Sequence, residues 1–301
     1  MARQKRTFYP LMISRNRLYP LIIAIVSLVV VLWCWRIIRT TDFVGYADPA
    51  AYGQVAHNIA AGRGPVQDFI DFFYQRTPTI THLTDHWYSL FTILLLPFFF
   101  GWGKSALAVK LPVLLAYLLL PLSVYFLGAR LFNSHTGFLA ALTTALHPYI
   151  LEYSINGWPD IPATVLTVWV LLCYLKTREH RLWYLLLGFT LGLLCWFRAS
   201  GFLIGAGLIL DFMWHSRKEL LRSCFLWLGI VTFILGYGPA LYSNLHYFGV
   251  PFKSSHTNLS ATMGYFGNPQ EEHWQILWDN PPALAAKIRT EGFQTIFYKT
   301  G

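Results

Sequence analysis

Strongly apolar segments recur along the chain and are separated by short polar intervals. The first runs from Pro20 to Trp35. Further apolar runs follow at 88–100, 105–127, 136–151, 161–175, 182–197, 201–214 and 223–242. Long apolar runs of this kind are typical of helices that cross a bilayer. The pattern therefore predicts an all-α polytopic membrane protein.

The segment 88–100 differs from the other runs because it is the shortest. A crossing helix needs about 17–25 residues, and Pro97 with the following Gly101-Trp102-Gly103 favours a helix in the membrane boundary. With this segment left out, the basic loops 176–181 and 217–222 fall on the same side as the basic amino terminus. The positive-inside rule expects this arrangement. About seven spans and a cytoplasmic amino terminus are therefore predicted.

This topology divides the chain into five regions. We expect a basic cytoplasmic tail over 1–18, a first span over 19–39, an outer loop with amphipathic and interfacial helices over 40–104, the remaining spans over 105–245, and an outer tail over 246–301 that continues in a longer parent. The outer loop, the loop 152–160 and the turn 198–200 then share one face of the membrane. Polar residues far apart in the sequence are brought to the same side. Two small-residue pairs, Gly188/Gly192 and Gly201/Gly205, predict close helix packing.

Composition agrees with a membrane protein and excludes some functions. Hydrophobic residues make up 55% of the 301 residues and charged residues only 12%, which is outside the usual range of a soluble domain. The net charge of +9 comes from short basic clusters between apolar runs, so it indicates topology and not nucleic-acid binding. The four cysteines lie in or beside apolar segments and are expected to be buried thiols: Cys34, Cys173, Cys195 and Cys224.

The polar interval from Asp42 to His86 holds five of the fourteen acidic residues. Within it, Pro49 fits the first position of a helix, and Gly62 and Gly64 can end that helix. The apolar positions between them recur at helical spacing. A short amphipathic helix with an acidic residue at its start, Asp48, is therefore predicted directly after the first span.

Two carboxylates stand at the outer ends of predicted helices. Asp48 precedes Pro49, and Asp160 precedes the apolar run that begins at Ile161. Each could cap its helix by accepting the free amides of the first turn. Each could also carry chemistry on the outer face, and the residues alone leave both alternatives open.

Arg198 lies at the outer end of the run 182–197, where the positive-inside rule disfavours a cation. It could snorkel to lipid phosphate or hold the phosphate of a substrate. In the first outer loop, His82 and His86 have the i, i+4 spacing that permits a metal site on one helical face, with Asp85 beside them. No P-loop, dinucleotide fingerprint, nucleophile elbow or zinc spacing is present.

The order of these motifs resembles a known family. Asp48-Pro-Ala-Ala-Tyr52, followed by Ala56-His-Asn-Ile-Ala-Ala-Gly62, resembles the first outer-loop motif of the GT-C glycosyltransferases. The group that it most resembles is the polyprenyl-phosphate-sugar dependent, dolichyl-phosphate-mannose-protein mannosyltransferase-like family. Trp158-Pro-Asp160-Ile-Pro162 is similar to its second acidic motif. Cys195-Trp-Phe-Arg198-Ala-Ser-Gly201 matches the place of a family Lys or Arg near the lipid phosphate.

The resemblance covers roughly residues 20–255, with two departures, of which one is that relatives usually continue through several more spans. Where relatives often have an acidic residue, Lys and Pro-Pro, this chain has Thr84-Asp85-His86-Trp87. The resemblance implies a GT-C-like bundle and a hexosyl- or pentosyltransferase in the plasma or inner membrane, or in the ER membrane of a eukaryote. The donor would be a polyprenyl-phosphate-linked sugar, and the acceptor a lipid, glycan or protein on the outer face.

The resemblance also assigns roles to the residues singled out above. It implies Asp48 and Asp160 as catalytic residues, substrate binding by Arg198, Tyr52, Asp85 and His86, and a divalent metal held by Asp48, Asp160 and His86. Two other functions stay open: a lipid or small-molecule transporter, and a truncated non-catalytic relative. Internal repeats, which are typical of transporters, are not found in the sequence.

Overall fold

The computed structural model describes residues 18–69, 79–84, 89–220 and 224–249. In chain order these residues form α1 (Leu18–Ile38), α2 (Ala47–Ala60), β1 (Val66–Gln67), β2 (His82–Leu83), α3 (Leu90–Trp102), α4 (Ala106–Leu131), α5 (Ser134–Leu146), α6 (Pro148–Asn156), α7 (Asp160–Thr177), α8 (Trp183–Phe197), α9 (Ser200–Leu220) and α10 (Cys224–Phe248). The two strands pair antiparallel. The prediction of an all-α protein is confirmed.

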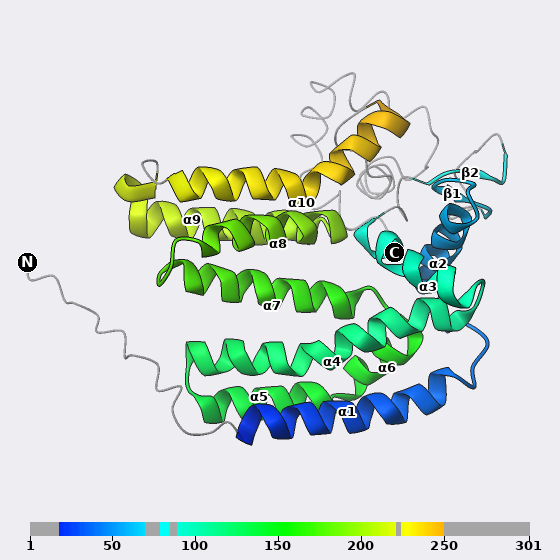
Figure 1. Ribbon diagram of the computed structural model, residues 1–301, viewed down its shortest axis with the longest axis horizontal. Coiled ribbons are helices and arrows are strands. Elements are labelled where there is room, and N and C mark those ends of the chain that lie inside the picture. Colours follow the sequence, from blue (N-terminus) through cyan, green and yellow to red (C-terminus); the bar gives the residue numbers. More distant parts are fainter. Residues whose placement is uncertain (1–17, 70–78, 85–88, 221–223, 250–301) are drawn as a thin grey trace, which may run out of the picture.

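Four of the described helices are long and apolar enough to cross a membrane: α1, α4, α7 and α10. The chain is therefore an integral membrane protein. Helix α8 and the apolar part of α9 are shorter, as is α5, but these three lie side by side with the four long helices (Figure 1). The expected total of about seven spans stays a prediction for α5, α8 and α9.

Helices α2 and α3 lie together with the two strands at one end of the bundle, which we call the α2–α3 end (Figure 1). The starts of α4, α7 and α9 and the last turns of α1, α6 and α8 meet there as well. Three separate polar regions thus come to one end: the described parts of 40–104, the loop 152–160 and the turn 198–200. The interfacial position of α3 and the membrane side of this end stay predictions.

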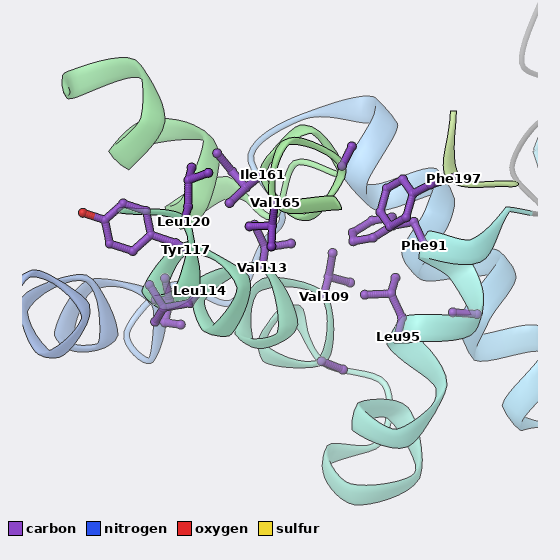
Figure 2. Close-up of a cluster of buried hydrophobic side chains, with 14 of the residues drawn as sticks. Phe91, Leu95, Val109, Val113, Leu114, Tyr117, Leu120, Ile161, Val165 and Phe197 are labelled. Atoms are coloured by element: carbon purple, nitrogen blue, oxygen red, sulfur yellow. The ribbon is translucent and has the colours of Figure 1, made fainter. Parts of the chain in front are cut away.

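An apolar cluster joins α3 to the long helices near this end (Figure 2). Phe91 and Leu95 of α3 meet Val109 of α4, and Ile161 of α7 belongs to the same cluster. Phe197, the last residue of α8, packs its ring 5.8 Å from that of Phe91. Burial of these large side chains is the main stabilising contribution at this corner. It also fixes the backbone directly before Arg198.

Helices α8 and α10 approach each other closely through glycines, as predicted for Gly188 and Gly192. A Cβ atom added to either residue would collide with backbone atoms of α10. A glycine of α10 packs on α8 in the same way, because a Cβ atom on Gly236 would lie 2.5 Å from the Phe189 carbonyl oxygen of α8. Gly201 of α9 packs in the same way on the end of α8, because a Cβ atom added to it would lie 2.8 Å from the Cys195 nitrogen.

Two details of the expected fold are wrong. The apolar run 136–151 is not one helix, because the chain breaks between α5 and α6 at Pro148. Proline lacks an amide hydrogen and its ring clashes with the preceding turn, so the helix restarts in a new direction. Cys224 is exposed at the start of α10, whereas the other three cysteines are buried as expected.

Candidate functional site

Asp48 lies in the first turn of α2, but it does not cap the helix. The helix begins at Ala47, two residues before the expected start at Pro49, and its cap residue is Tyr46, whose side chain makes no capping hydrogen bond. Asp48 is exposed, and among the described residues no hydrogen bond or ion pair engages its carboxylate. A negative charge in the first turn is stabilised by the helix dipole. Asp48 is therefore accessible at the α2–α3 end, in the first turn of α2.

Asp160 is the first residue of α7, and its carboxylate pairs with the side chain of Arg198 instead of capping the helix. The cap residue is Pro159, with no side-chain capping bond. Nη2 of Arg198 donates to Oδ2 of Asp160 at 3.0 Å. The two side chains are 42% and 31% exposed, so the pair contributes at most about 1 kcal/mol to stability. The ion pair also holds the Arg198 guanidinium between the start of α7 and the end of α8.

The backbone at Arg198 explains why its side chain emerges at this point. Helix α8 ends at Phe197, and Arg198 is extended, with φ −148° and ψ 137°. Its amide still donates to the Leu194 carbonyl at 2.8 Å. The ring of Phe197 is anchored in the apolar cluster (Figure 2). Snorkelling alone therefore does not describe Arg198, because its guanidinium is held by a carboxylate from another helix.

Tyr52 follows Asp48 by one helical turn and points to α3. Its ring lies edge-on to Phe91, with 5.2 Å between centroids. Its phenol forms a hydrogen bond with the side chain of Ser89. Burial raises the pKa of Tyr52 to about 12. At neutral pH the phenol therefore keeps its proton and can act only as a neutral hydrogen-bonding group.

The pKa of Tyr52 also depends on the charged side chains around its phenol. The positive charge of Arg198 lowers the pKa of Tyr52, and the negative charges of Asp48 and Asp160 raise it, although each effect is smaller than that of burial. Coulombic effects of this kind act over short distances. The structure thus brings four of the sequence-predicted residues, from α2, α7 and the end of α8, around one polar centre.

The remaining sequence-predicted residues, Asp85 and His86, lie outside the described residues. His82 is in strand β2 and not in a helix, so the helical spacing expected for His82 and His86 is wrong. No three His, Cys, Asp or Glu side chains within the described ranges gather as metal ligands. Because Asp160 already accepts from Arg198, the described residues do not by themselves form a metal-ligand set.

Sequence reasoning missed a second ion pair at the same end. Asp68 binds Arg63 at 2.6 Å, and it also accepts from Asn58 at 3.1 Å and from Thr81 at 2.9 Å. These hydrogen bonds, that from Arg63 foremost, lower the pKa of Asp68. Asn58 is buried and also donates to the Val66 carbonyl. The asparagine of the outer-loop motif therefore holds the segment after α2 in place.

Sequence reasoning also missed a contact between the two acidic motifs. The hydroxyl of Tyr46 donates to Oε1 of Glu152 at 2.6 Å, and its ring lies 5.1 Å from that of Trp158. A signal was present in the sequence, because an aromatic residue precedes each candidate acid by two positions, in Tyr46-Ala-Asp48 and in Trp158-Pro-Asp160. That spacing alone does not show that the two rings meet.

Comparison with known proteins supports the resemblance found in the motifs. A family model described as dolichyl-phosphate-mannose-protein mannosyltransferase matches residues 87–242, more than half of the chain. The match includes Asp160 and Arg198 and begins after Asp48 and Tyr52. Searches of curated proteins and of solved structures give no match. The matched range runs from α3 into α10, and with the membrane helices it indicates a membrane glycosyltransferase of the GT-C type. The chain belongs to the dolichyl-phosphate-mannose-protein mannosyltransferase family.

Proposed function

We propose that this protein transfers a sugar from a polyprenyl-phosphate donor to a hydroxyl group of a lipid, glycan or protein acceptor. The observation that carries the proposal is the Arg198–Asp160 ion pair, which lies with Asp48 and Tyr52 at the end of a membrane bundle. A carboxylate with no partner among the described residues and a partly exposed guanidinium are the two groups that such a transfer needs.

The reaction assigns a separate role to each group. Asp48 accepts the proton of the acceptor hydroxyl while the hydroxyl oxygen forms a bond to the anomeric carbon of the sugar. The bond from that carbon to the phosphate oxygen breaks, and the electron pair leaves with the lipid phosphate. Arg198 stabilises the negative charge on that phosphate with charge-assisted hydrogen bonds. Asp160 keeps the guanidinium oriented, and the Tyr52 phenol hydrogen-bonds a sugar or phosphate oxygen.

The proposal places the α2–α3 end on the outer face of the membrane. Its support is the sequence, in which the span count places the basic segments 1–18, 176–181 and 217–222 on the opposite side. Positive residues of this kind are typical of cytoplasmic loops. A divalent metal held by Asp48, Asp160 and His86 is a second proposal for the same carboxylates. Under that proposal, chelation stops transfer and added Mg²⁺ or Mn²⁺ restores it.

The test is the variant Asp48→Asn, assayed for transfer from a lipid-linked sugar in reconstituted membranes. Asparagine keeps the shape of the side chain but cannot take a proton. Loss of a general base lowers the rate by about a hundred-fold or more, and we expect no change in folding because the side chain is exposed.

The matched control is Asp42→Asn, which removes another exposed carboxylate from the segment between α1 and α2. This control should transfer like the parent. Parental turnover in Asp48→Asn would remove Asp48 from the reaction. Absence of transfer in the parent itself, with every family donor tested, would favour the non-catalytic relative.

A further inference from the structure

The segments that lead into the two candidate acids touch each other. Tyr46 precedes Asp48 by two residues, and Trp158 precedes Asp160 by two residues. The two rings lie 5.1 Å apart with an interplanar angle of 55°. The start of α2 is thereby placed against the start of α7, although more than a hundred residues separate them in the sequence.

A polar contact fixes this arrangement from the side of α6. The Tyr46 hydroxyl donates to Glu152, and the Glu152 carbonyl accepts from the side chain of Asn156 at 3.0 Å. Gly45 lies directly against the Asn156 side chain, and a Cβ atom at Gly45 would collide with its Oδ1. A larger residue at Gly45 would therefore displace the Asn156 side chain or the start of α2.

The other half of the contact is anchored to the bundle. Trp158 stacks on Tyr153, with 5.2 Å between centroids and 22° between planes. The residue before it, Gly157, has φ +79° and ends α6 in the left-handed conformation, which glycine adopts without strain. A Cβ atom there would lie 3.1 Å from Val109 of α4. Trp158 is thus held by its stacking on Tyr153 and by the contact of the preceding Gly157 with α4.

Helix α2 does not need Tyr46 in order to fold. Val55 and Ala56 in its second half are fully buried, and Asn58 ties its end to the following loop. Its first turn is buried on one side only, because Pro49 is buried whereas Tyr46, Ala47 and Asp48 are exposed. Tyr46 therefore ties the exposed side of this turn, which carries Asp48, to Glu152 of α6.

We infer that the Tyr46–Glu152 pair is a positioning device for the transfer reaction. It holds the Asp48 carboxylate at a fixed place relative to the Asp160–Arg198 pair, and neither Tyr46 nor Glu152 touches the reacting atoms. The inference rests on the proposed function for its kinetic consequence, but the contact itself can be tested without any transfer assay.

The kinetic test compares Tyr46→Phe with Tyr149→Phe, which removes the same hydroxyl from an exposed tyrosine of α6. Misplacing a catalytic group by about 1 Å can cost up to a hundred-fold in rate. We expect kcat of Tyr46→Phe to fall about ten-fold or more, with KM for the donor unchanged because Arg198 is untouched. Glu152→Gln keeps an acceptor oxygen and should lose less. The double variant Tyr46→Phe/Glu152→Gln should be no slower than Tyr46→Phe alone, because both substitutions break the same contact.

The second test replaces the hydrogen bond by a covalent link. In a Cys224→Ser background, Tyr46→Cys and Glu152→Cys are bridged by a short bifunctional thiol reagent in membranes. Efficient bridging, and recovery of kcat on bridging, are expected. The matched pair Tyr149→Cys with Tyr46→Cys should not restore kcat.

Each outcome is informative. Failure to bridge would show that the contact is wrong, whatever the protein catalyses. Bridging with no transfer in the parent would leave the contact standing and overturn the proposed function. If Tyr46→Phe only lowers thermal stability, with kcat per folded protein unchanged, the pair is structural and the positioning role is overturned.

Discussion

Two Arg–Asp ion pairs lie at the α2–α3 end, and their carboxylates differ in the number of hydrogen-bond partners. The Asp68 carboxylate accepts from Arg63, Asn58 and Thr81. Within the described residues, the Asp160 carboxylate has only Arg198 as a partner. A carboxylate whose lone pairs are all used holds a structure together, whereas one with unused lone pairs can exchange partners. The difference separates a structural ion pair from a functional candidate.

The two pairs also differ in what they connect. Arg63 and Asp68 are five residues apart and close a loop after α2. Asp160 and Arg198 are 38 residues apart and join the start of α7 to the residue after the end of α8. A phosphate can compete for Arg198 without opening a loop. Displacing Arg63 would instead break its hydrogen bonds to Asn58 and Asp68 and open the loop.

The strongest test of this difference removes each arginine in turn. Arg198→Ala should lower donor-dependent transfer by about ten- to a hundred-fold, since a lost charge-assisted contact costs about 1.5–3 kcal/mol. Arg63→Ala should instead lower the thermal stability and leave the transfer per folded protein near the parental value. Both are measured as donor turnover and as melting temperature in detergent. If the two variants lose transfer equally, the distinction between the pairs is wrong.

Replacing Arg198 by lysine tests whether its geometry, and not only its charge, is needed. Arg198→Lys keeps the charge but loses the planar fork that binds phosphate with two hydrogen bonds. We expect a several-fold loss in donor affinity, smaller than for Arg198→Ala, by titration with the lipid-linked sugar. A lysine variant that matches the parent would mean that Arg198 acts only as a point charge, as snorkelling predicts.

The smallest expected effect concerns acid stability. The pKa of Asp68 is lowered in the folded protein, chiefly by Arg63. Its stabilising contribution is therefore complete above the unfolded pKa of about 3.9 and is lost as pH falls below that value towards the folded pKa. Asp68→Asn should flatten the fall in melting temperature in this acidic range, and Asp42→Asn should not. An unchanged slope in Asp68→Asn would show that the network does not hold the loop.

Sequence reasoning succeeded where one local property decided the structure. Apolar runs gave the long helices, and counting spans brought Asp48, Asp160 and Arg198 to a common end. Gly62 and Gly64 were expected to end α2, and both have positive φ. The small-residue pair at Gly188 and Gly192 was expected to pack closely, and it does. Periodicity and glycine freedom are each readable within a few residues.

The interpretation failed where tertiary contacts decided. Asp48 and Asp160 were weighed as helix caps, because Asp before a helix commonly caps it. In the structure the cap positions are Tyr46 and Pro159, and Asp160 is taken up by an arginine from another helix. The Tyr46–Glu152 hydrogen bond spans 106 residues. No local pattern specifies such a partner.

The glycine contact between α8 and α10 has a consequence for lipid traffic. Backbone meets backbone along this seam, and a Cβ on Gly229 would lie only 2.9 Å from the Tyr184 carbonyl oxygen. A prenyl chain, several ångströms thick, has no room to slide between these two helices. In the proposed function, a polyprenyl donor would therefore enter from another direction to bring its phosphate to Arg198. The flank of α8 beside α9 is one route, since α9 touches α8 less extensively than α10 does.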